Sequence, residues 1–170
     1  MEEKTLVGLR WIVEILDANK IPYQIGGGLA AHLYGSPRAV NDIDISLSGK
    51  YFEQIIPLVS AYITEGPKHY VNEKWDCTTL SLNYEGQDID MTDVDTLRMS
   101  NLNQTAWIQV RDIRLHEPVI MNVGGVSVRI MDPRDLLRYK NELGGEHQRV
   151  DITAIEKYSN VRGETSDRPK

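Results

Sequence analysis

Acidic residues recur at a two-residue spacing in two segments of the sequence. Asp42 and Asp44 stand in DIDISL, and Asp88 and Asp90 stand in QDIDM. Because successive side chains of a β-strand point to opposite faces, each pair would place both carboxylates on one face. Neighbouring carboxylates repel, and either solvent exposure or a bound hard cation such as Mg²⁺ offsets that repulsion. If the two strands are neighbours, their acids can hold two divalent ions for in-line displacement at phosphorus.

Three consecutive glycines precede the first acidic pair: Gly26, Gly27 and Gly28. They separate a short strand expected at 23–25 from a short helix expected at 29–34. Such a turn lets backbone N–H groups approach an anion closely, with the positive end of the helix dipole behind them. The sequence therefore predicts a phosphate cradle, with a tight strand–helix turn as the alternative. The spacing of the glycines matches neither the P-loop motif GxxxxGK[ST] nor the dinucleotide-binding motif GxGxxG.

Helices and strands must alternate to position these residues. Apolar spacing predicts an amphipathic helix from Leu6 to the segment before Pro22, and a second helical stretch over 50–62 that contains Pro57. Alternation predicts a strand over 42–47 and two hairpins, 78–84 with 88–94 and 119–122 with 126–131. Asp132 and Pro133 are typical of a helix start, and glycines at 144–145 are typical of its end.

Length and composition limit the function classes. The chain has 170 residues, 25 acidic against 19 Lys and Arg, and a net charge of −6. We expect a single domain over 1–159 and a disordered tail over 160–170. The negative charge argues against broad nucleic-acid binding, and the sequence shows no DNA-binding motif. It has no apolar run of spanning length and no secretion signal, so we expect a cytoplasmic protein with no membrane contact. We expect Cys77, the single cysteine, to be buried.

The glycine pair, a short helix, Arg38 and then Asp42-Ile-Asp44 resemble the DNA polymerase β-like nucleotidyltransferase superfamily. Within it, the segment is most similar to bacterial minimal nucleotidyltransferases and AbiEii-like proteins. The resemblance extends over residues 22–47, 80–94 and 130–156. It implies an α+β fold, the polymerase β-like nucleotidyltransferase fold, with a small mixed β-sheet and helices packed on one face.

The resemblance also implies an activity. Members transfer a nucleoside monophosphate from a nucleoside triphosphate (NTP) such as ATP to an acceptor hydroxyl, with Mg²⁺ or Mn²⁺. Asp42, Asp44 and Asp90 match the positions of the metal-binding, catalytic acids, and Asp90 would also take the acceptor's proton. Asp88 is a rival for the place of Asp90. The acceptor is left open among tRNA, a protein and a small molecule.

Other residues match nucleotide-binding positions of the superfamily. The resemblance implies phosphate contacts from the glycine turn, Ser36, Arg38 and Lys140, with Asp151 supporting Lys140. The alternatives are an ion pair of Arg38 with Asp42 or Asp44, a solvated Lys140, and Asp151 as a helix cap.

Two departures from the superfamily pattern bear on activity. Gly28 stands where many members have Ser or Thr, and Val40 stands where many have Thr. They leave two alternatives beside the enzyme: a nucleotide-binding module of this fold with weak or no catalysis, and a toxin–antitoxin component.

Overall fold

The computed structural model describes residues 1–110 and 114–166 of the chain. These described residues form five α-helices, nine strands and two short 3₁₀ turns. In chain order the helices and strands are α1 (Glu3–Ala18), β1 (Tyr23–Ile25), α2 (Gly27–Leu33), β2 (Asp42–Leu47), α3 (Phe52–Val59), β3 (Ile63–Val71), β4 (Trp75–Tyr84), β5 (Gln87–Asp93), β6 (Arg98–Ser100), β7 (Trp107–Gln109), β8 (Val119–Val123), β9 (Val126–Ile130), α4 (Pro133–Leu143) and α5 (Glu146–Ser166).

All nine strands belong to one mixed sheet. Its order is β7-β6-β4-β5-β2-β1-β9-β8, and β3 pairs with β4 beside this path. Strand β2 lies in the middle, antiparallel to β1 and parallel to β5. The α+β class with a mixed sheet is confirmed, although the sheet is larger than the small one expected.

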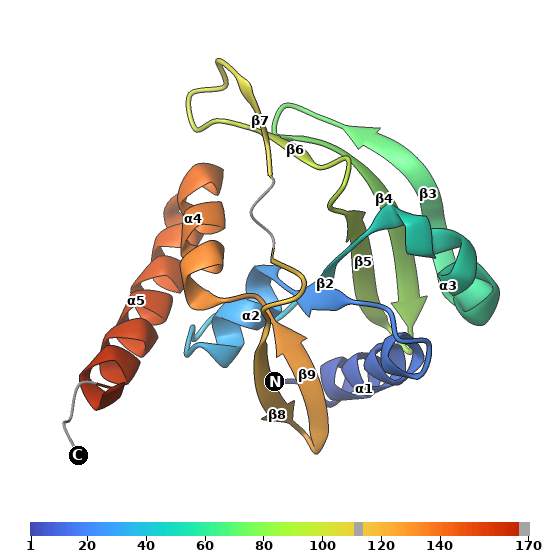
Figure 1. The fold of residues 1–170 in the computed structure, drawn as a ribbon, viewed down its shortest axis with the longest axis horizontal. Coiled ribbons are helices and arrows are strands. Elements are labelled where there is room, and N and C mark those ends of the chain that lie inside the picture. Colours follow the sequence, from blue (N-terminus) through green and yellow to red (C-terminus); the bar gives the residue numbers. More distant parts are fainter. Residues whose placement is uncertain (111–113, 167–170) are drawn as a thin grey trace.

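Helix α1 covers one face of the sheet (Figure 1). Its buried stripe includes Leu9, Ile12 and Leu16, spaced as the sequence predicted for an amphipathic helix. The side chain of Ile43 on β2 reaches this helix at Gly8. Strand β2 alternates buried and half-buried residues, so its isoleucines lie in the core and its aspartates lie on the other face.

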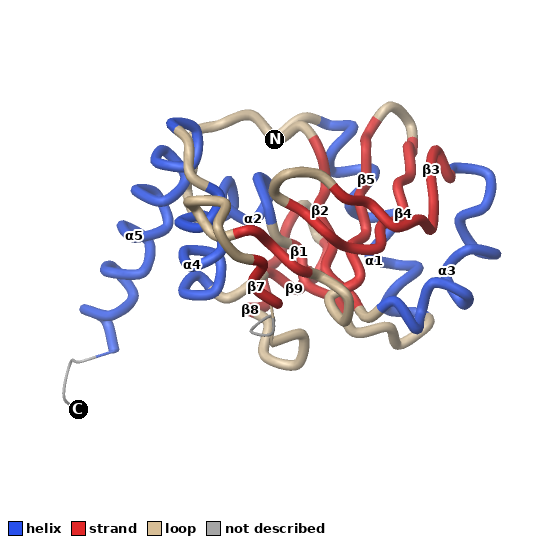
Figure 2. The backbone as a smooth tube through the Cα atoms, turned by 90° about the horizontal axis from the view of Figure 1, so that it is seen from above, coloured by secondary structure: helices blue, strands red, loops and turns tan. Residues whose placement is uncertain are grey.

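Helices α2, α4 and α5 pack together at one end of the sheet (Figures 1 and 2). The backbone N–H of Arg134 donates to the side chain of Asp132 at 2.9 Å, with Pro133 in the first turn. Gly144 ends α4 with φ +67°, a backbone conformation that favours glycine. Both predicted boundaries of this helix are therefore confirmed.

Several individual elements also differ from the sequence predictions. Strands β3, β6 and β7 were not predicted, because most side chains of β3 and β7 are exposed and the strands lack apolar alternation. Helix α2 starts two residues early, within the glycines. Helix α5 continues to Ser166, past the expected domain end at 159, and residues 167–170 of the expected tail lie outside the described residues.

Within residues 1–110 and 114–166, no helix combines the length and the hydropathy needed to cross a membrane.

Candidate active site

The two acidic pairs lie side by side on the sheet. Strands β2 and β5 pair in parallel, with Asp42 opposite Asp88 and Asp44 opposite Asp90. Hydrogen-bonded strands lie about 4.8 Å apart, so carboxylates on paired positions of one face are direct neighbours. The predicted meeting of the acids is therefore confirmed.

Asp90 and Asp88 differ in their surroundings. The hydroxyl of Ser81 on β4 donates to Oδ1 of Asp90 at 2.5 Å. Asp88 is exposed and accepts from the side-chain amide of Asn83 at 2.7 Å. Asp90 faces the same cleft as Asp42 and Asp44, whereas Asp88 lies outside it. The geometry therefore favours Asp90 over its rival.

The cleft has a volume of about 510 Å³, which is in the usual range for small-molecule sites. It runs from the glycine turn after β1 across β2, β5 and β4 to β3, and Met131 and Tyr139 close it from the side of α4. Its lining residues are Gly26, Gly27, Asp42, Asp44, Ile45, Ser46, Glu65, Tyr70, Trp75, Cys77, Thr79, Ser81, Asp90, Thr92, Leu97, Met131 and Tyr139.

The carboxylate of Asp44 lies directly against Gly27, in the space that a side chain would fill. Gly27 has a φ of +56°, in the left-handed region, and a Cβ on this residue would lie 1.6 Å from Oδ2 of Asp44. The backbone N–H of the next residue, Gly28, donates to the Asp44 carboxylate. The glycine turn therefore allows backbone to approach an anion closely, as the sequence predicted, and the anion in this structure is Asp44.

The acids perturb one another. Burial, then the negative charges of Asp42 and Asp90, raise the pKa of Asp44 to about 7, against the hydrogen bond from Gly28 and the charge of Lys140. Burial and the charge of Asp90 also raise the pKa of Asp42. Such like-charge clusters are typical of sites that bind a cation or move a proton.

A buried polar cluster lies beside the acids, centred on Asp151 of α5. Lys140 of α4 donates to Oδ2 of Asp151 at 2.7 Å, and Arg38 donates to the same atom at 2.5 Å. The hydroxyl of Ser36 donates to Oδ1 at 2.6 Å. Burial would raise the pKa of Asp151, but the hydrogen bonds from Lys140 and Ser36 and the charges of Lys140 and Arg38 outweigh it, so the pKa is lowered.

No protein-family model matches the chain, and no curated protein sequence matches it. Solved structures do. The candidate nucleotidyltransferase TM1012 from Thermotoga maritima superimposes with a TM-score of 0.67 and 20% identity, over 99% of this chain and 96% of that one. The chain has the nucleotidyltransferase fold.

Two antibiotic-modifying enzymes share this nucleotidyltransferase fold at lower similarity. The lincosamide antibiotic adenylyltransferase LnuA, solved with lincomycin, has a TM-score of 0.57 and 14% identity over 88% of this chain and 95% of its own. ANT(2")-Ia, solved with adenylyl-2"-tobramycin, has a TM-score of 0.56 and 14% identity over 94% of this chain and 95% of its own. At such identities the likeness establishes the fold alone.

Within this fold, the residues expected at the phosphates occupy two places. Gly26 and Gly27 line the cleft, whereas Ser36, Arg38 and Lys140 are held by Asp151. The alternative for Arg38, an ion pair with Asp42 or Asp44, was wrong, because Asp151 takes the guanidinium. The solvated position for Lys140 was also wrong, because this residue is only 2% exposed. Asp151 supports Lys140 and does not cap α5, which begins at Glu146.

A divalent metal would find oxygen ligands here but not a finished site. Among the residues that the structure describes, no three His, Cys, Asp or Glu side chains lie close enough to hold a metal ion as they stand. The donor chemistry nevertheless fits a hard cation. The carboxylates of Asp42, Asp44 and Asp90 lie on one face of the sheet, and the negative charges of Asp42 and Asp90 act on Asp44. Mg²⁺ therefore remains a proposal, with these three carboxylates as its ligands.

Sequence reasoning missed several residues of the cleft. The predicted hairpin, with its turn at 85–87, would have placed Ser81 opposite Met91; the observed turn is one residue shorter, and Ser81 is paired with Asp90. No sequence pattern pointed to Tyr139. It lies beside the acids, and burial together with the charges of Asp44 and Asp42 raises its pKa. Trp75 lies next to Tyr139, with ring centroids 5.8 Å apart. Cys77 is buried as predicted, and its pKa is raised by burial to about 11.

The raised pKa of Asp44 predicts a pH-dependent stability. The carboxyl has a pKa of 3.8 when unperturbed and about 7 in the fold. Between these values the folded protein holds more protons than the unfolded chain, so the free energy of unfolding falls as pH rises from about 4 to about 7. Asp44→Asn removes this loss. In metal-free buffer we expect the free energy of unfolding of Asp44→Asn to exceed that of the wild type by about 1 to 3 kcal/mol near pH 8. Below about pH 4 the two free energies should be equal.

Urea denaturation curves at a series of pH values measure this difference. Ser46→Ala, on the same face of β2 but without a charge, serves as the control and should show the wild-type pH dependence. A difference between Asp44→Asn and the wild type that is equal at all pH values would contradict the prediction.

Proposed function

We propose that the protein is a Mg²⁺-dependent nucleotidyltransferase that moves a nucleoside monophosphate from an NTP to an acceptor hydroxyl. The observation that supports it most is the in-register pairing of Asp44 with Asp90, with Asp42 on the same face, at the floor of a cleft bordered by the glycine turn. A fold shared with adenylyltransferases adds to this support.

The reaction is an in-line displacement. The acceptor oxygen forms a bond to the α-phosphorus of the NTP, the bond from that phosphorus to the bridging oxygen breaks, and pyrophosphate leaves. The hydroxyl proton passes to a base. We assign that role to Asp90, because it faces the cleft and accepts a hydrogen bond from Ser81.

The chain's own residues mainly hold and align the reactants. Asp42, Asp44 and Asp90 would hold Mg²⁺, which when bound neutralises phosphate charge and the charge of the three acids. The NTP phosphates would lie over the glycine turn, where Gly26 and Gly27 leave the backbone accessible from the cleft. Arg38 and Lys140, supported by Asp151, add positive charge beside the acids.

A small molecule is the acceptor that the comparisons favour over tRNA or a protein. LnuA was solved with lincomycin, and ANT(2")-Ia with an adenylylated tobramycin. They cover 88% and 94% of this chain, so the shared fold supports a small acceptor by analogy.

A nucleotide-binding protein with weak or no catalysis is the second candidate. It is favoured by two observations: within 1–110 and 114–166 the acids do not form a ready metal cluster, and Gly28 offers no hydroxyl to a phosphate. A toxin–antitoxin role would use the same chemistry in another setting, and the test below addresses the chemistry.

A thermal shift separates the transferase from a bare scaffold. The three acids repel a triphosphate, so NTP alone should bind weakly, and Mg²⁺ should restore binding. A ligand that binds only the folded state at a hundredfold excess over its Kd adds about 2.7 kcal/mol to stability, which raises the Tm by several degrees. We expect this shift to need both Mg²⁺ and NTP, and to vanish in Asp44→Asn and Asp90→Asn.

Transfer itself is measured with α-labelled NTPs, Mg²⁺ and a cell extract as the source of acceptor. We expect label on a small molecule, and a loss of about 100-fold or more in Asp90→Asn. Asp88→Asn is the matched control, because Asp88 stands two residues away on the same face but outside the cleft. A thermal shift without any label transfer would favour the non-catalytic binding protein, and a shift that persists with chelator would exclude the metal-dependent mechanism.

A further inference from the structure

The cleft continues well beyond the acids. From Asp44 and Asp90 it extends over β4 to β3, where it is lined by residues with no role in the proposed phosphate chemistry. These residues decide what can lie next to the reacting phosphorus.

A row of hydroxyl groups crosses the sheet one register step from the acids. Ser46 of β2 is paired with Thr92 of β5, and Thr92 is paired with Thr79 of β4. All three side chains are half-buried and line the cleft. Within residues 1–110 and 114–166, no hydrogen bond is made by their hydroxyls, unlike that of Ser81 in the next row. They are therefore available to a ligand as both donors and acceptors.

Aromatic rings border this hydroxyl row. Trp75 lies in line with Thr79 on the same face of β4, and its ring is tilted by 32° to that of Tyr139. Tyr70 of β3 is paired with Cys77 and also lines the cleft. Flat apolar surfaces beside unpaired hydroxyls suit a ring that carries polar groups at its edge and an apolar face, as sugars and cyclitols do.

The side chains that line the cleft disfavour an anion in this region. None of the described residues that line it is Lys, Arg or His, whereas Asp42, Asp44, Asp90 and Glu65 are acidic. Lys68 of β3 pairs with Glu65, which lines the cleft. Nucleic acids are held chiefly by Lys and Arg at their phosphates, so an RNA acceptor would find no partner here.

The direction of attack assigns this region to the acceptor. In an in-line displacement the attacking oxygen and the leaving group lie on opposite sides of the phosphorus. If pyrophosphate leaves on the side of the glycine turn, the acceptor enters from the side of β4 and β3, where the hydroxyl row lies. This step rests on the proposed function.

We propose that Ser46, Thr79 and Thr92, with Trp75 and Tyr70, form the acceptor subsite, and that it takes a hydroxyl-bearing small molecule with no negative charge. A sugar-like ring, neutral or carrying an amine, meets this description; an RNA or a phosphorylated acceptor does not.

Ligand-observed NMR tests the subsite without any nucleotide. The probes are a neutral sugar, the matching amino sugar, the matching sugar phosphate and tobramycin, each at millimolar concentration. We expect saturation transfer to the neutral and amine-bearing probes and none to the sugar phosphate. Thr79→Val and Thr92→Val keep side-chain shape but lose the hydroxyl, and each should weaken binding about 2- to 10-fold. Thr78→Val, on the opposite face of β4, is the matched control and should bind as the wild type does.

Every outcome bears on the proposal. Equal binding of the sugar phosphate, binding that Thr79→Val and Thr92→Val leave unchanged, or no binding of any sugar probe would overturn the acceptor subsite. Transfer of label to tRNA would overturn it too, while leaving the transferase intact. The thermal shift with Mg²⁺ and NTP reports separately on the proposed function, so the two can fail independently.

Discussion

Gly27→Ala is expected to cost the fold about 3 to 5 kcal/mol and to abolish the proposed nucleotide binding. Two effects add. An alanine at φ +56° is strained by about 1 to 2 kcal/mol, and its Cβ would lie 1.6 Å from Oδ2 of Asp44, so the carboxylate must move. Moving it breaks the hydrogen bond from the N–H of Gly28 and displaces one member of the acidic cluster.

The adjacent glycine provides the control. No atom lies within 4 Å of a Cβ built on Gly28, and its φ is outside the left-handed region. Gly28→Ala should therefore fold with wild-type stability or gain about 0.4 to 1 kcal/mol from a less flexible unfolded chain. Urea denaturation gives both free energies of unfolding, and the thermal shift with Mg²⁺ and NTP gives binding. Similar losses in the two variants would mean that the turn tolerates no side chain at all, and that the contact with Asp44 is not the cause.

Local patterns were sufficient to locate the acids. The alternation of Asp and Ile in 42–45 and 88–91 gives strands with a charged and an apolar face, and burial in the structure follows that alternation. The sequence pattern alone did not predict that β2 pairs with β5, because a parallel pairing between distant segments leaves no local signal in the sequence. The resemblance to a known superfamily supplied that link, and the register of Asp44 with Asp90 confirms it.

Long-range contacts made the rest unpredictable. Asp151 binds Ser36 and Arg38 across more than a hundred residues of chain, and spacing does not show such pairs. Strand β3 follows no apolar alternation, since only one edge of it is paired and most of its side chains are exposed. The far wall of the cleft, with Glu65 and Tyr70, depends on that strand and was therefore not expected.

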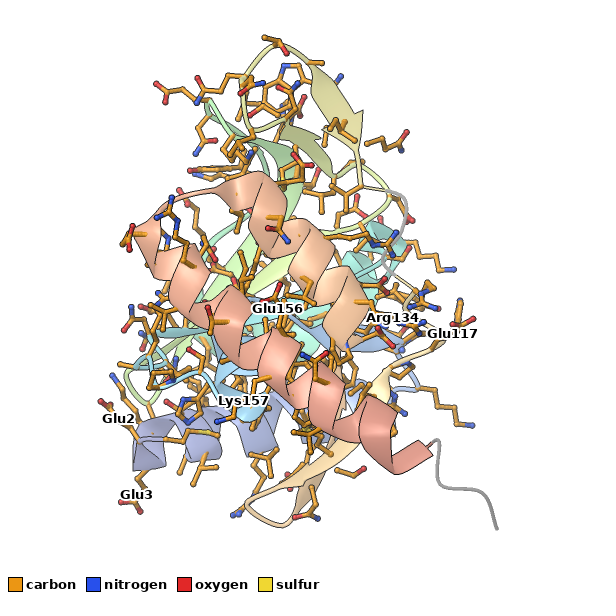
Figure 3. The ribbon with its side chains drawn as sticks, turned by 90° about the vertical axis from the view of Figure 1, so that its left-hand side faces the viewer. Glu2, Glu3, Glu117, Arg134, Glu156 and Lys157 are labelled. Atoms are coloured by element: carbon orange, nitrogen blue, oxygen red, sulfur yellow. The ribbon has the colours of Figure 1, made fainter. Side chains whose placement is uncertain are left out.

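Asp151→Asn is expected to destabilise the protein by about 3 to 5 kcal/mol, because it leaves a buried ammonium without its counter-ion. Lys140 is 2% exposed, and among the described residues its other hydrogen-bond partner is the neutral side chain of Gln148 at 3.0 Å. Arg38 is part-exposed and can be solvated, so Lys140 carries most of the loss. Asp151 is buried, whereas the outer surface of the same helix, α5, carries Glu156 and Lys157 (Figure 3).

A double variant tests whether the buried charge is the cause. Lys140→Met removes the ammonium and keeps an apolar stem of similar length, so Asp151→Asn with Lys140→Met should recover at least half of the stability that Asp151→Asn loses. Arg149→Gln breaks the exposed pair with Glu146 on the same helix and should change stability by less than about 0.5 kcal/mol. Denaturation of the wild type, Asp151→Asn, Lys140→Met and the double variant gives the coupling free energy between Lys140 and Asp151. Additive losses in the double variant would mean that packing around α4 and α5, and not the ion pair, sets the stability of this cluster.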